Sequence, residues 1–170
     1  MVKIAFLDRD GVINKLVDNR PPWRFEEFEF IDGVQEAVDL LKKMGYVTQI
    51  VTNQPDVDDG LMEEAELVKI NNHIVQTLSV DGISVARTRG TECYKPNPGM
   101  LNKIINKYKA STDHSWMIGD TWKDISAGAN AGVRTIYIGT DRRISTFPDC
   151  PTIRTTSLKG AASFLKHMEN

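Results

Sequence analysis

The chain has 170 residues with a formal charge of −2 at pH 7, and 41% of its residues are hydrophobic and 26% charged. This balance is typical of a globular protein, contains no apolar run near the about 20 residues of a membrane helix, and offers no basic surplus for nucleic-acid binding. The N-terminus lacks a signal-peptide pattern and only two cysteines occur, so we expect a cytoplasmic protein without a disulfide framework. We expect one domain over residues 1–170 that acts as a monomer. We expect it to bind neither nucleic acid nor membranes.

The chain begins with an apolar strand, predicted over Val2–Leu7, that is followed at once by two carboxylates. Asp8 and Asp10 share one side if the extended backbone continues, because residues i and i+2 of a strand point the same way. Gly11 then permits a sharp turn. The segment is typical of a reactive strand end, although the same residues also suit an ordinary turn.

A loop follows over Lys15–Phe30, because two consecutive prolines exclude a helix there, and it ends in a short extended piece. It contains Arg20, Trp23 and Arg24. The two arginines are candidates for binding an anionic or sugar-like group beside Asp8, with Trp23 offering a flat apolar face. A solvated arginine pair, with Trp23 covering the edge of the core, is the alternative interpretation.

Apolar spacing then predicts a helix over Gly33–Met44 with Asp32 as its N-cap, and a second strand over Tyr46–Val51. The second strand ends in Thr52 and Asn53. Hydroxyl and amide groups at a strand end can donate hydrogen bonds to an oxyanion, although an unusual turn at Asn53 explains the pair nearly as well.

The rest of the chain continues to alternate helices and strands. These elements are predicted over Met62–Leu78, Gly82–Ala86, Met100–Tyr108, Trp116–Ile118, Thr135–Ile138, Thr152–Thr155 and Leu158–His167. Lys95 lies on a proline-rich loop, where it is either a point charge for a phosphate or an ordinary solvated lysine. Asp120 follows the strand at 116–118 as a predicted N-cap, and Asp124 lies one helical turn later on the same face.

Strict alternation predicts an α/β fold, a Rossmann-like parallel sheet with helices on both faces and no large cap domain. If the first and fourth strands are neighbours at the switch point, Asp8, Asp10 and Asp120 share one crevice. Each like-charge pair at ~4 Å would cost on the order of 4 kcal/mol at an effective dielectric near 20. Clustered carboxylates without histidine or thiol ligands therefore predict bound Mg²⁺. With Lys95 and the Thr52 hydroxyl, such a site suits phosphoryl transfer through an aspartyl-phosphate.

Four segments together resemble the ordered motifs of the haloacid dehalogenase (HAD) superfamily. They are Asp8-Arg9-Asp10-Gly11, Val51-Thr52-Asn53-Gln54, Tyr94 to Leu101, and Gly119-Asp120 with Asp124. The resemblance covers nearly the whole chain. The segment 28–34 and the short insertions resemble the subfamily IIIA branch that holds heptose bisphosphate and histidinol-phosphate phosphatases.

The resemblance implies that Asp8 is the nucleophile and Asp10 the general acid and then base. It implies that Asp8, the main-chain carbonyl of Asp10, and Asp120 hold Mg²⁺ with support from Asp124. It also implies that Thr52, Asn53 and Lys95 bind the phosphoryl group.

Two features depart from that branch. Many members carry a four-ligand zinc loop before the lysine motif, whereas here only Cys93 remains, so we expect no structural zinc. The heptose phosphatases also resemble one another in having an arginine directly before the lysine, where this chain has Tyr94. Arg87 or Arg89 is the candidate replacement.

We therefore expect a HAD-type phosphatase of carbohydrate metabolism that acts on a small phosphorylated metabolite, such as D-glycero-D-manno-heptose 1,7-bisphosphate. Histidinol phosphate is the alternative substrate, and the acidic balance argues against a nucleic-acid 3′-phosphatase. From a different class, a phospho-receiver or binding module remains, although the predicted strand at 82–86 lacks the aspartate that a receiver would carry there.

Overall fold

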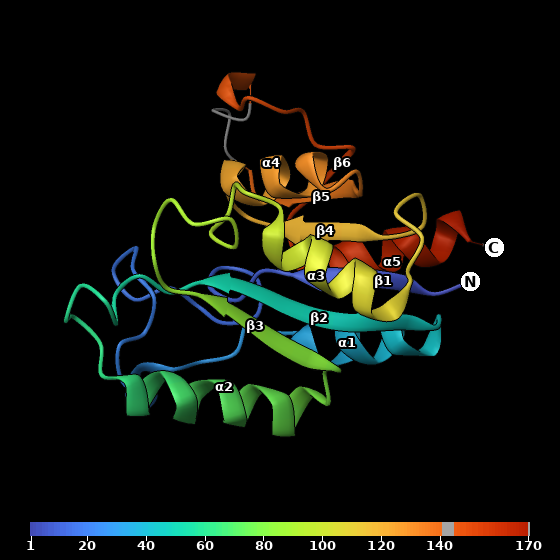
Figure 1. Cartoon of the computed structure of the whole chain (residues 1–170). Helices are drawn as coiled ribbons and strands as arrows, with labels where there is room; N and C mark the ends of the chain where they lie inside the picture. Colours follow the sequence, from blue (N-terminus) through green and yellow to red (C-terminus); the bar gives the residue numbers. More distant parts are fainter. Residues whose placement is uncertain (141–144, 170) are drawn as a thin grey trace.

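The computed structural model describes residues 1–140 and 145–169 and contains one six-stranded sheet in the order β3-β2-β1-β4-β5-β6 (Figure 1). All five strand pairings are parallel. The strands are β1 (Lys3–Leu7), β2 (Tyr46–Asn53), β3 (Gly82–Ala86), β4 (Trp116–Gly119), β5 (Arg134–Ile138) and β6 (Ile153–Thr155). The predicted α/β class and the adjacency of the first and fourth strands are both confirmed.

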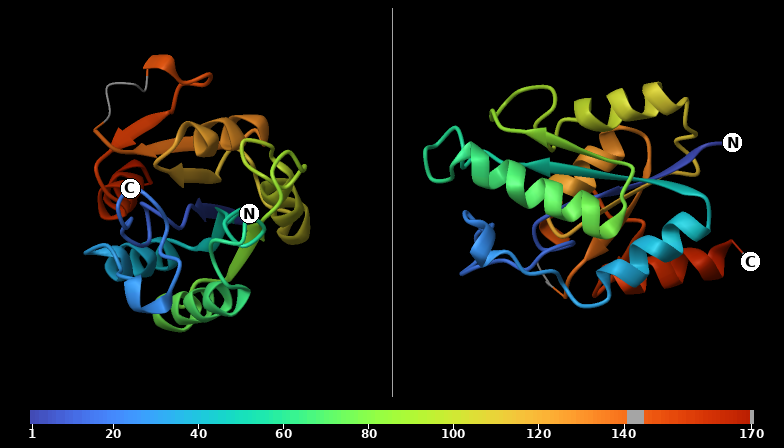
Figure 2. Two further views of the ribbon diagram at one scale, coloured as in Figure 1. Left: turned by 90° about the vertical axis from the view of Figure 1, so that its left-hand side faces the viewer. Right: turned by 90° about the horizontal axis from the view of Figure 1, so that it is seen from below.

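Helices cover both faces of the sheet, as the alternating pattern predicts. They are α1 (Val34–Lys43), α2 (Glu64–Leu78), α3 (Gly99–Tyr108), α4 (Trp122–Asn130) and α5 (Leu158–Met168), with a short 3₁₀ helix η1 (Phe25–Glu27) before α1. Apolar residues of α1, α2 and α5 form one core layer with the sheet, and those of α3 and α4 form a second layer on the other face. Figure 2 shows the two layers from the end and from below.

The carboxyl ends of the strands meet at one edge of the molecule, and both termini lie at the opposite edge (Figure 1). Leu7 at the end of β1 pairs in register with Ile118 of β4, so the segments that follow these strands leave the sheet side by side. Crossovers that reverse direction at this point open a crevice outside the strand ends. The fold therefore places the residues after Leu7 and Ile118 next to each other.

Two predicted helix caps are wrong. The N-cap of α1 is Gly33, with φ of 80°, rather than Asp32; the left-handed turn there suits glycine and makes no use of a carboxylate cap. The N-cap of α4 is Thr121 rather than Asp120, and Asp124 completes a capping box with it. The shift by one residue matters because it releases the Asp120 side chain from capping.

The predicted extended piece at the end of the 15–30 loop begins instead with the turn η1. The Glu27 carboxylate accepts hydrogen bonds from the Trp23 main chain at 2.9 Å and from the Arg20 guanidinium at 2.7 Å, which closes the chain on itself. The extended part follows η1: Phe28 has extended backbone angles, and Phe30 forms an isolated bridge with Asn14. This loop is therefore folded back toward the strand end.

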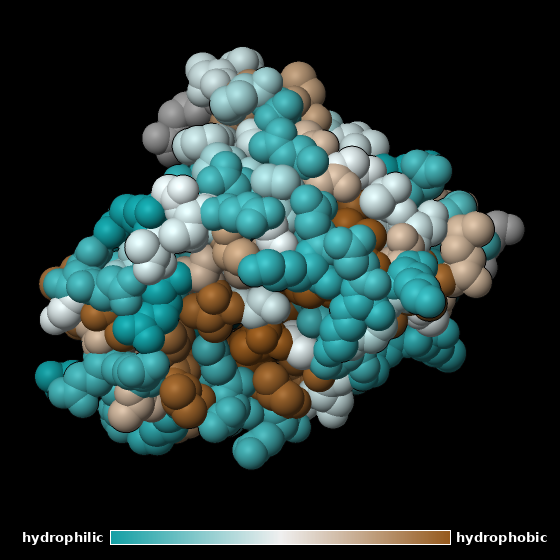
Figure 3. Space-filling model, in the orientation of Figure 1, coloured by the Kyte–Doolittle hydropathy of each residue, from teal (hydrophilic) through white to brown (hydrophobic). Residues whose placement is uncertain are grey.

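Apolar side chains gather on one face over β3, between α2 and α3 (Figure 3). β3 is an edge strand whose first four residues are only half-buried, and Val68 of α2 is 50% exposed. This patch lies beside the carboxyl edge of the sheet rather than at it. None of the described helices is long and apolar enough to cross a membrane.

Candidate active site

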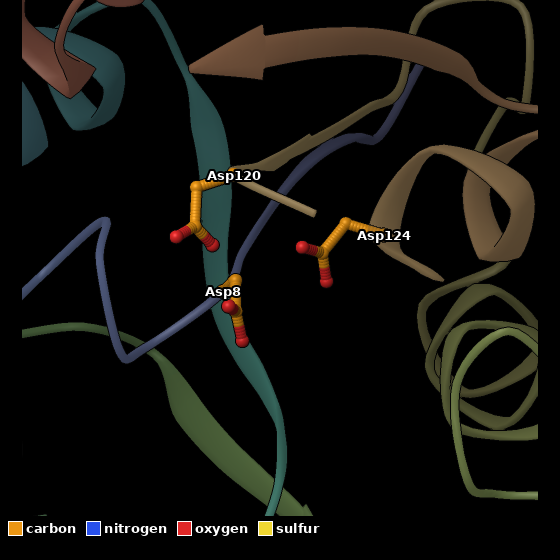
Figure 4. A group of neighbouring side chains, drawn as sticks. All are labelled: Asp8, Asp120 and Asp124. Carbon is orange, nitrogen blue, oxygen red and sulfur yellow. The ribbon is translucent and has the colours of Figure 1, made fainter. Parts of the chain in front are cut away.

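Three carboxylates converge in the crevice at the switch point (Figure 4). Asp8 follows β1, Asp120 follows β4, and Asp124 lies in the first turn of α4. One oxygen from each lies within 4.8 Å of the others, and Asp8 and Asp124 are 8% and 1% exposed. The structure thus brings together three of the four aspartates predicted for the site.

Lys95 is buried against this cluster. Its ammonium group donates to Asp8 Oδ1 at 2.8 Å, to Asp124 Oδ1 at 2.6 Å and to the main-chain oxygen of Val51 at 2.8 Å. The Asn53 amide accepts from the Lys95 N–H at 3.0 Å and donates to its carbonyl at 2.9 Å. The Asn53 side chain therefore holds the lysine loop, and its predicted contact with a phosphate stays a prediction.

Electrostatics in the crevice favour a cation. Burial first, and then the charge of Asp124, raise the pKa of Asp8 to about 6, although the Lys95 ammonium opposes this shift. Burial and the charges of Asp8 and Asp124 raise the pKa of Asp120 to about 9. Raised pKa values mean that the folded protein binds these protons more tightly than the unfolded chain, so ionising the cluster lowers the stability of the metal-free protein as pH rises.

Asp10 lies beside the cluster but turns its carboxylate toward other partners. Its Oδ1 accepts from the Arg9 guanidinium at 3.0 Å and from the Asn14 amide at 3.0 Å. Its Oδ2 accepts from the Gln54 amide at 2.6 Å. The predicted contribution of Asp10 to a metal site through its main-chain carbonyl stays a prediction.

Three residues that hold Asp10 were not predicted from the sequence. Gln54 could have been found, because it follows Thr52 at the i+2 spacing of an extended segment, and its amide indeed also donates to Thr52 Oγ1 at 2.9 Å. Arg9 is fully buried and donates to Asn71 of α2 at 3.0 Å. Nothing in the sequence around Arg9 signals that a cation is buried there, because arginines between two aspartates are usually solvated.

Among the described residues, three buried side-chain oxygens lack a hydrogen-bond partner, and all three belong to this site: Asn14 Oδ1, Gln54 Oε1 and Asp120 Oδ1. Buried acceptors are costly when left unpaired, so they indicate where a cation, water or substrate hydroxyl is received. The unpaired Asp120 Oδ1 and an all-carboxylate donor set fit a hard divalent cation such as Mg²⁺. Asp8 and Asp120 would hold it, with Asp124 behind them.

The loop residues predicted to meet the substrate are held by other contacts. The Arg20 guanidinium pairs with Glu27 and lies 4.0 Å from the centre of the Trp23 ring, whose Nε1 donates to Asp56 at 2.7 Å. The Arg20 hydrogen bond is the main reason that the pKa of Glu27 falls to about 2. Arg24 lines a cavity of about 680 Å³ together with four glutamates, namely Glu26, Glu27, Glu63 and Glu66.

Arg87 and Arg89 form ion pairs across two neighbouring loops. Arg87 pairs with Asp58 at 2.8 Å and with Glu64 at 2.9 Å, and Arg89 pairs with Asp59 at 2.6 Å. These contacts join the loop after β3 to the loop after β2. Both guanidinium groups are therefore shared with carboxylates, and their predicted role in substrate selection stays a prediction.

Gly11 provides a test of how tightly the crevice is built. Its φ is +84°, and a Cβ added there would lie 2.1 Å from Asp120 Oδ2. We expect Gly11→Ala to displace Asp120, to lower the free energy of unfolding by about 1–3 kcal/mol and to weaken Mg²⁺ binding by at least about tenfold. Calorimetric Mg²⁺ titration and thermal unfolding measure the two effects.

Gly60 is a matched control, because its φ is +73° but an added Cβ would have no neighbour within 4 Å. Gly60→Ala carries the same kind of backbone strain without touching the site. Equal Mg²⁺ affinities of the two variants would contradict the packing of Asp120 on Gly11.

A doubly wound parallel sheet with acidic residues and a buried lysine at its switch point defines the molecule as a Rossmann-like hydrolase of the phosphoryl-transfer type. The model of the haloacid dehalogenase-like hydrolase family matches residues 8–138. The chain belongs to this family.

Two proteins of similar sequence carry names of one kind of phosphatase. The D-glycero-alpha-D-manno-heptose-1,7-bisphosphate 7-phosphatase of Campylobacter jejuni is 32% identical over 142 residues, which are 80% of this chain and 81% of that protein. The D-glycero-beta-D-manno-heptose-1,7-bisphosphate 7-phosphatase of Salmonella typhi is 37% identical over 149 residues, covering 79% and 78%. The expected class, a HAD-type phosphatase, is thereby confirmed.

A solved structure agrees with these relatives. The D,D-heptose 1,7-bisphosphate phosphatase of B. bronchiseptica, complexed with magnesium and phosphate, superposes with a TM-score of 0.84 and 26% identity over 98% of this chain and 99% of that one. The sheet and helices described here are thus those of a HAD phosphatase throughout their length.

Proposed function

We propose that this protein is a Mg²⁺-dependent phosphomonoesterase that removes the 7-phosphate of D-glycero-D-manno-heptose 1,7-bisphosphate. The observation that carries the proposal is the contact of Lys95 with Asp8 and Asp124 beside Asp120, in a chain similar over most of its length to phosphatases of that name. We further propose that it forms one cytoplasmic, monomeric domain without structural zinc, which binds neither nucleic acid nor membranes.

Asp8 is the proposed nucleophile. The ammonium of Lys95 binds its Oδ1 and so fixes the direction of the carboxylate toward the crevice. Attack forms a bond between an Asp8 oxygen and phosphorus while the bond from phosphorus to the sugar oxygen breaks. Lys95 and the Thr52 hydroxyl balance charge on the phosphoryl group, and Asn53 contributes by holding the Lys95 main chain.

Asp10 handles the protons. It gives a proton to the departing sugar oxygen, and it then takes one from the water that attacks phosphorus and releases Asp8 and inorganic phosphate. Gln54, Asn14 and Arg9 hold its carboxylate within reach of the crevice during both steps. Bound Mg²⁺ would supply positive charge beside the transferring group.

The test is phosphate release with Mg²⁺ or with EDTA. The substrates are both anomers of the heptose 1,7-bisphosphate, because the relatives are named for either one, together with histidinol phosphate and a 3′-phosphorylated oligonucleotide. We expect Mg²⁺-dependent turnover of a heptose bisphosphate well above the other two compounds. Turnover of histidinol phosphate alone would replace the proposed substrate, and stable phosphorylation without release would indicate a receiver module. Light scattering after size-exclusion chromatography tests the monomer.

A further inference from the structure

The proposed substrate carries a second phosphate, remote from the reacting one, and the rim of the crevice must accommodate it. A phosphate monoester carries close to two negative charges at neutral pH. The loop and helix start that follow β2 supply carboxylates at this rim, namely Asp56, Asp58, Asp59, Glu63, Glu64 and Glu66. A bisphosphate therefore needs a cation outside the reaction centre whose charge is not already neutralised.

Most cations on the loops around the crevice, within residues 1–140 and 145–169, do not meet this requirement. Four of them are paired with carboxylates: Lys15 with Glu29, Arg20 with Glu27, Arg87 with Asp58 and Glu64, and Arg89 with Asp59. Arg24 forms no ion pair within the described residues, but it shares its cavity with four glutamates, whose negative charge opposes a phosphate there. Lys95 is buried in the reaction centre itself, where it binds Asp8 and Asp124.

Lys123 is different. It lies in the first turn of α4, half-buried, and among the described residues no carboxylate pairs with it. Its ammonium group instead lies 5.7 Å from the centre of the Tyr94 ring. An aromatic face attracts and orients a cation but leaves its charge in place, whereas a carboxylate neutralises it.

Two successive contacts between the loop before α3 and the first turn of α4 position Lys123. Inside the crevice, Lys95 binds Asp124; one residue earlier on each segment, Tyr94 receives Lys123. Tyr94 is itself 8% exposed and packed in the core layer beneath α3. The outer contact is therefore fixed to the reaction centre by the inner one, and Lys123 is half-buried whereas Lys95 and Asp124 are only 2% and 1% exposed.

We propose that Lys123, positioned by Tyr94, binds the non-reacting phosphate of the bisphosphate substrate and so determines the preference for a bisphosphate over a monophosphate. This inference rests on the proposed function. It assigns the binding of the 1-phosphate to a lysine on α4 rather than to Arg87 or Arg89.

The experiment compares the heptose 1,7-bisphosphate with the same heptose carrying only the 7-phosphate. We expect Lys123→Ala to raise KM for the bisphosphate by about ten- to hundredfold while kcat changes little. The variant loses a charge-assisted contact that is made equally in the enzyme–substrate complex and in the transition state. KM for the monophosphate should stay within about twofold of the wild type, since the lost contact does not involve the reacting group. Lys123→Arg should restore the preference.

Lys107→Ala is a matched control, because Lys107 also lies over a tyrosine, 5.2 Å from the ring centre of Tyr108, but at the far end of α3. It should leave both KM values unchanged. Equal effects of Lys123→Ala on the two substrates, or no effect on either, would overturn the role of Lys123. Absence of turnover of either compound by the wild type would overturn the proposed function instead.

A binding measurement on a variant without catalysis tests the role of Lys123 separately from the proposed function. Asp8→Asn should bind the bisphosphate in a calorimetric titration, and adding Lys123→Ala should weaken that binding by about tenfold or more. Unchanged binding in the double variant would reject the inference even where the wild type hydrolyses the bisphosphate.

Discussion

Asp8→Asn is expected to reduce kcat on the best substrate by about 10⁴-fold or more, because the substitution removes the oxygen nucleophile on which a two-step hydrolysis depends. The variant should fold normally. Without Mg²⁺ it should be at least as stable as the wild type, since it removes one charge from a buried cluster in which burial and Asp124 already raise the pKa of Asp8 to about 6.

Single-turnover phosphate release and thermal unfolding in EDTA measure these two expectations. Asp113→Asn is the control, because Asp113 is an exposed acidic residue before β4, at the edge of the sheet away from the crevice. A kcat within about tenfold of the wild type would remove Asp8 from the nucleophile's role. A marked loss of stability in EDTA would contradict the repulsion inferred in the cluster.

Lys95→Met is expected to lower the free energy of unfolding of the metal-free protein by about 3–5 kcal/mol, because it leaves Asp8 and Asp124 buried without their shared cation. Hydrolysis should be lost as well, since the same ammonium balances charge on the phosphoryl group in the proposed mechanism. Chemical denaturation monitored by fluorescence gives the first quantity, and phosphate release gives the second.

Lys42→Met provides the comparison. Lys42 pairs with Asp81 at 3.2 Å on the surface, where both side chains are about one third exposed, and such pairs contribute about 1 kcal/mol or less. Similar losses of stability in the two variants would show that Lys95 is not the counter-charge of the acidic cluster. Added Mg²⁺ should recover part of the stability of Lys95→Met, because the cation would take over the neutralisation.

Local sequence patterns were sufficient to predict the α-helices and strands and most residues of the proposed site. The spacing of apolar residues predicts each α-helix and strand to within about two residues, whereas the 3₁₀ helix η1 was not predicted. The strands end in Asp8, Thr52 and Asp120, and the rule that parallel strands bind ligands beyond their carboxyl ends brings these residues to one crevice. Asp124 follows because one helical turn separates it from Asp120.

Local sequence patterns did not predict which of two neighbouring residues forms the N-cap of a helix. Asp32 and Asp120 both have the right chemistry for an N-cap, but Gly33 and Thr121 take those positions. A cap is decided by the backbone angle at which the chain enters the helix, and that angle depends on what the preceding strand and loop pack against.

The partners of charged loop residues depend on contacts between distant segments. The loops after β2 and β3 meet only because β3 pairs with β2, and this pairing brings Arg87 and Arg89 to carboxylates that the sequence alone did not assign to them. Lys123 and Tyr94, 29 positions apart as Lys95 and Asp124 are, meet for a similar reason.

The sequence by itself therefore determined the α/β architecture and predicted that Asp8, Asp120, Asp124 and Lys95 lie together, because strand ends and helical spacing are short-range properties of the chain. Only the tertiary structure decided which charges remain free. Arg9 is buried against Asp10, the loop residues Arg20, Arg87 and Arg89 pair with carboxylates, and Lys123 lies over the Tyr94 ring. Neutralisation depends on which side chains from separate elements come within a few ångströms of one another, and that is fixed by the packing of the whole sheet and its helices.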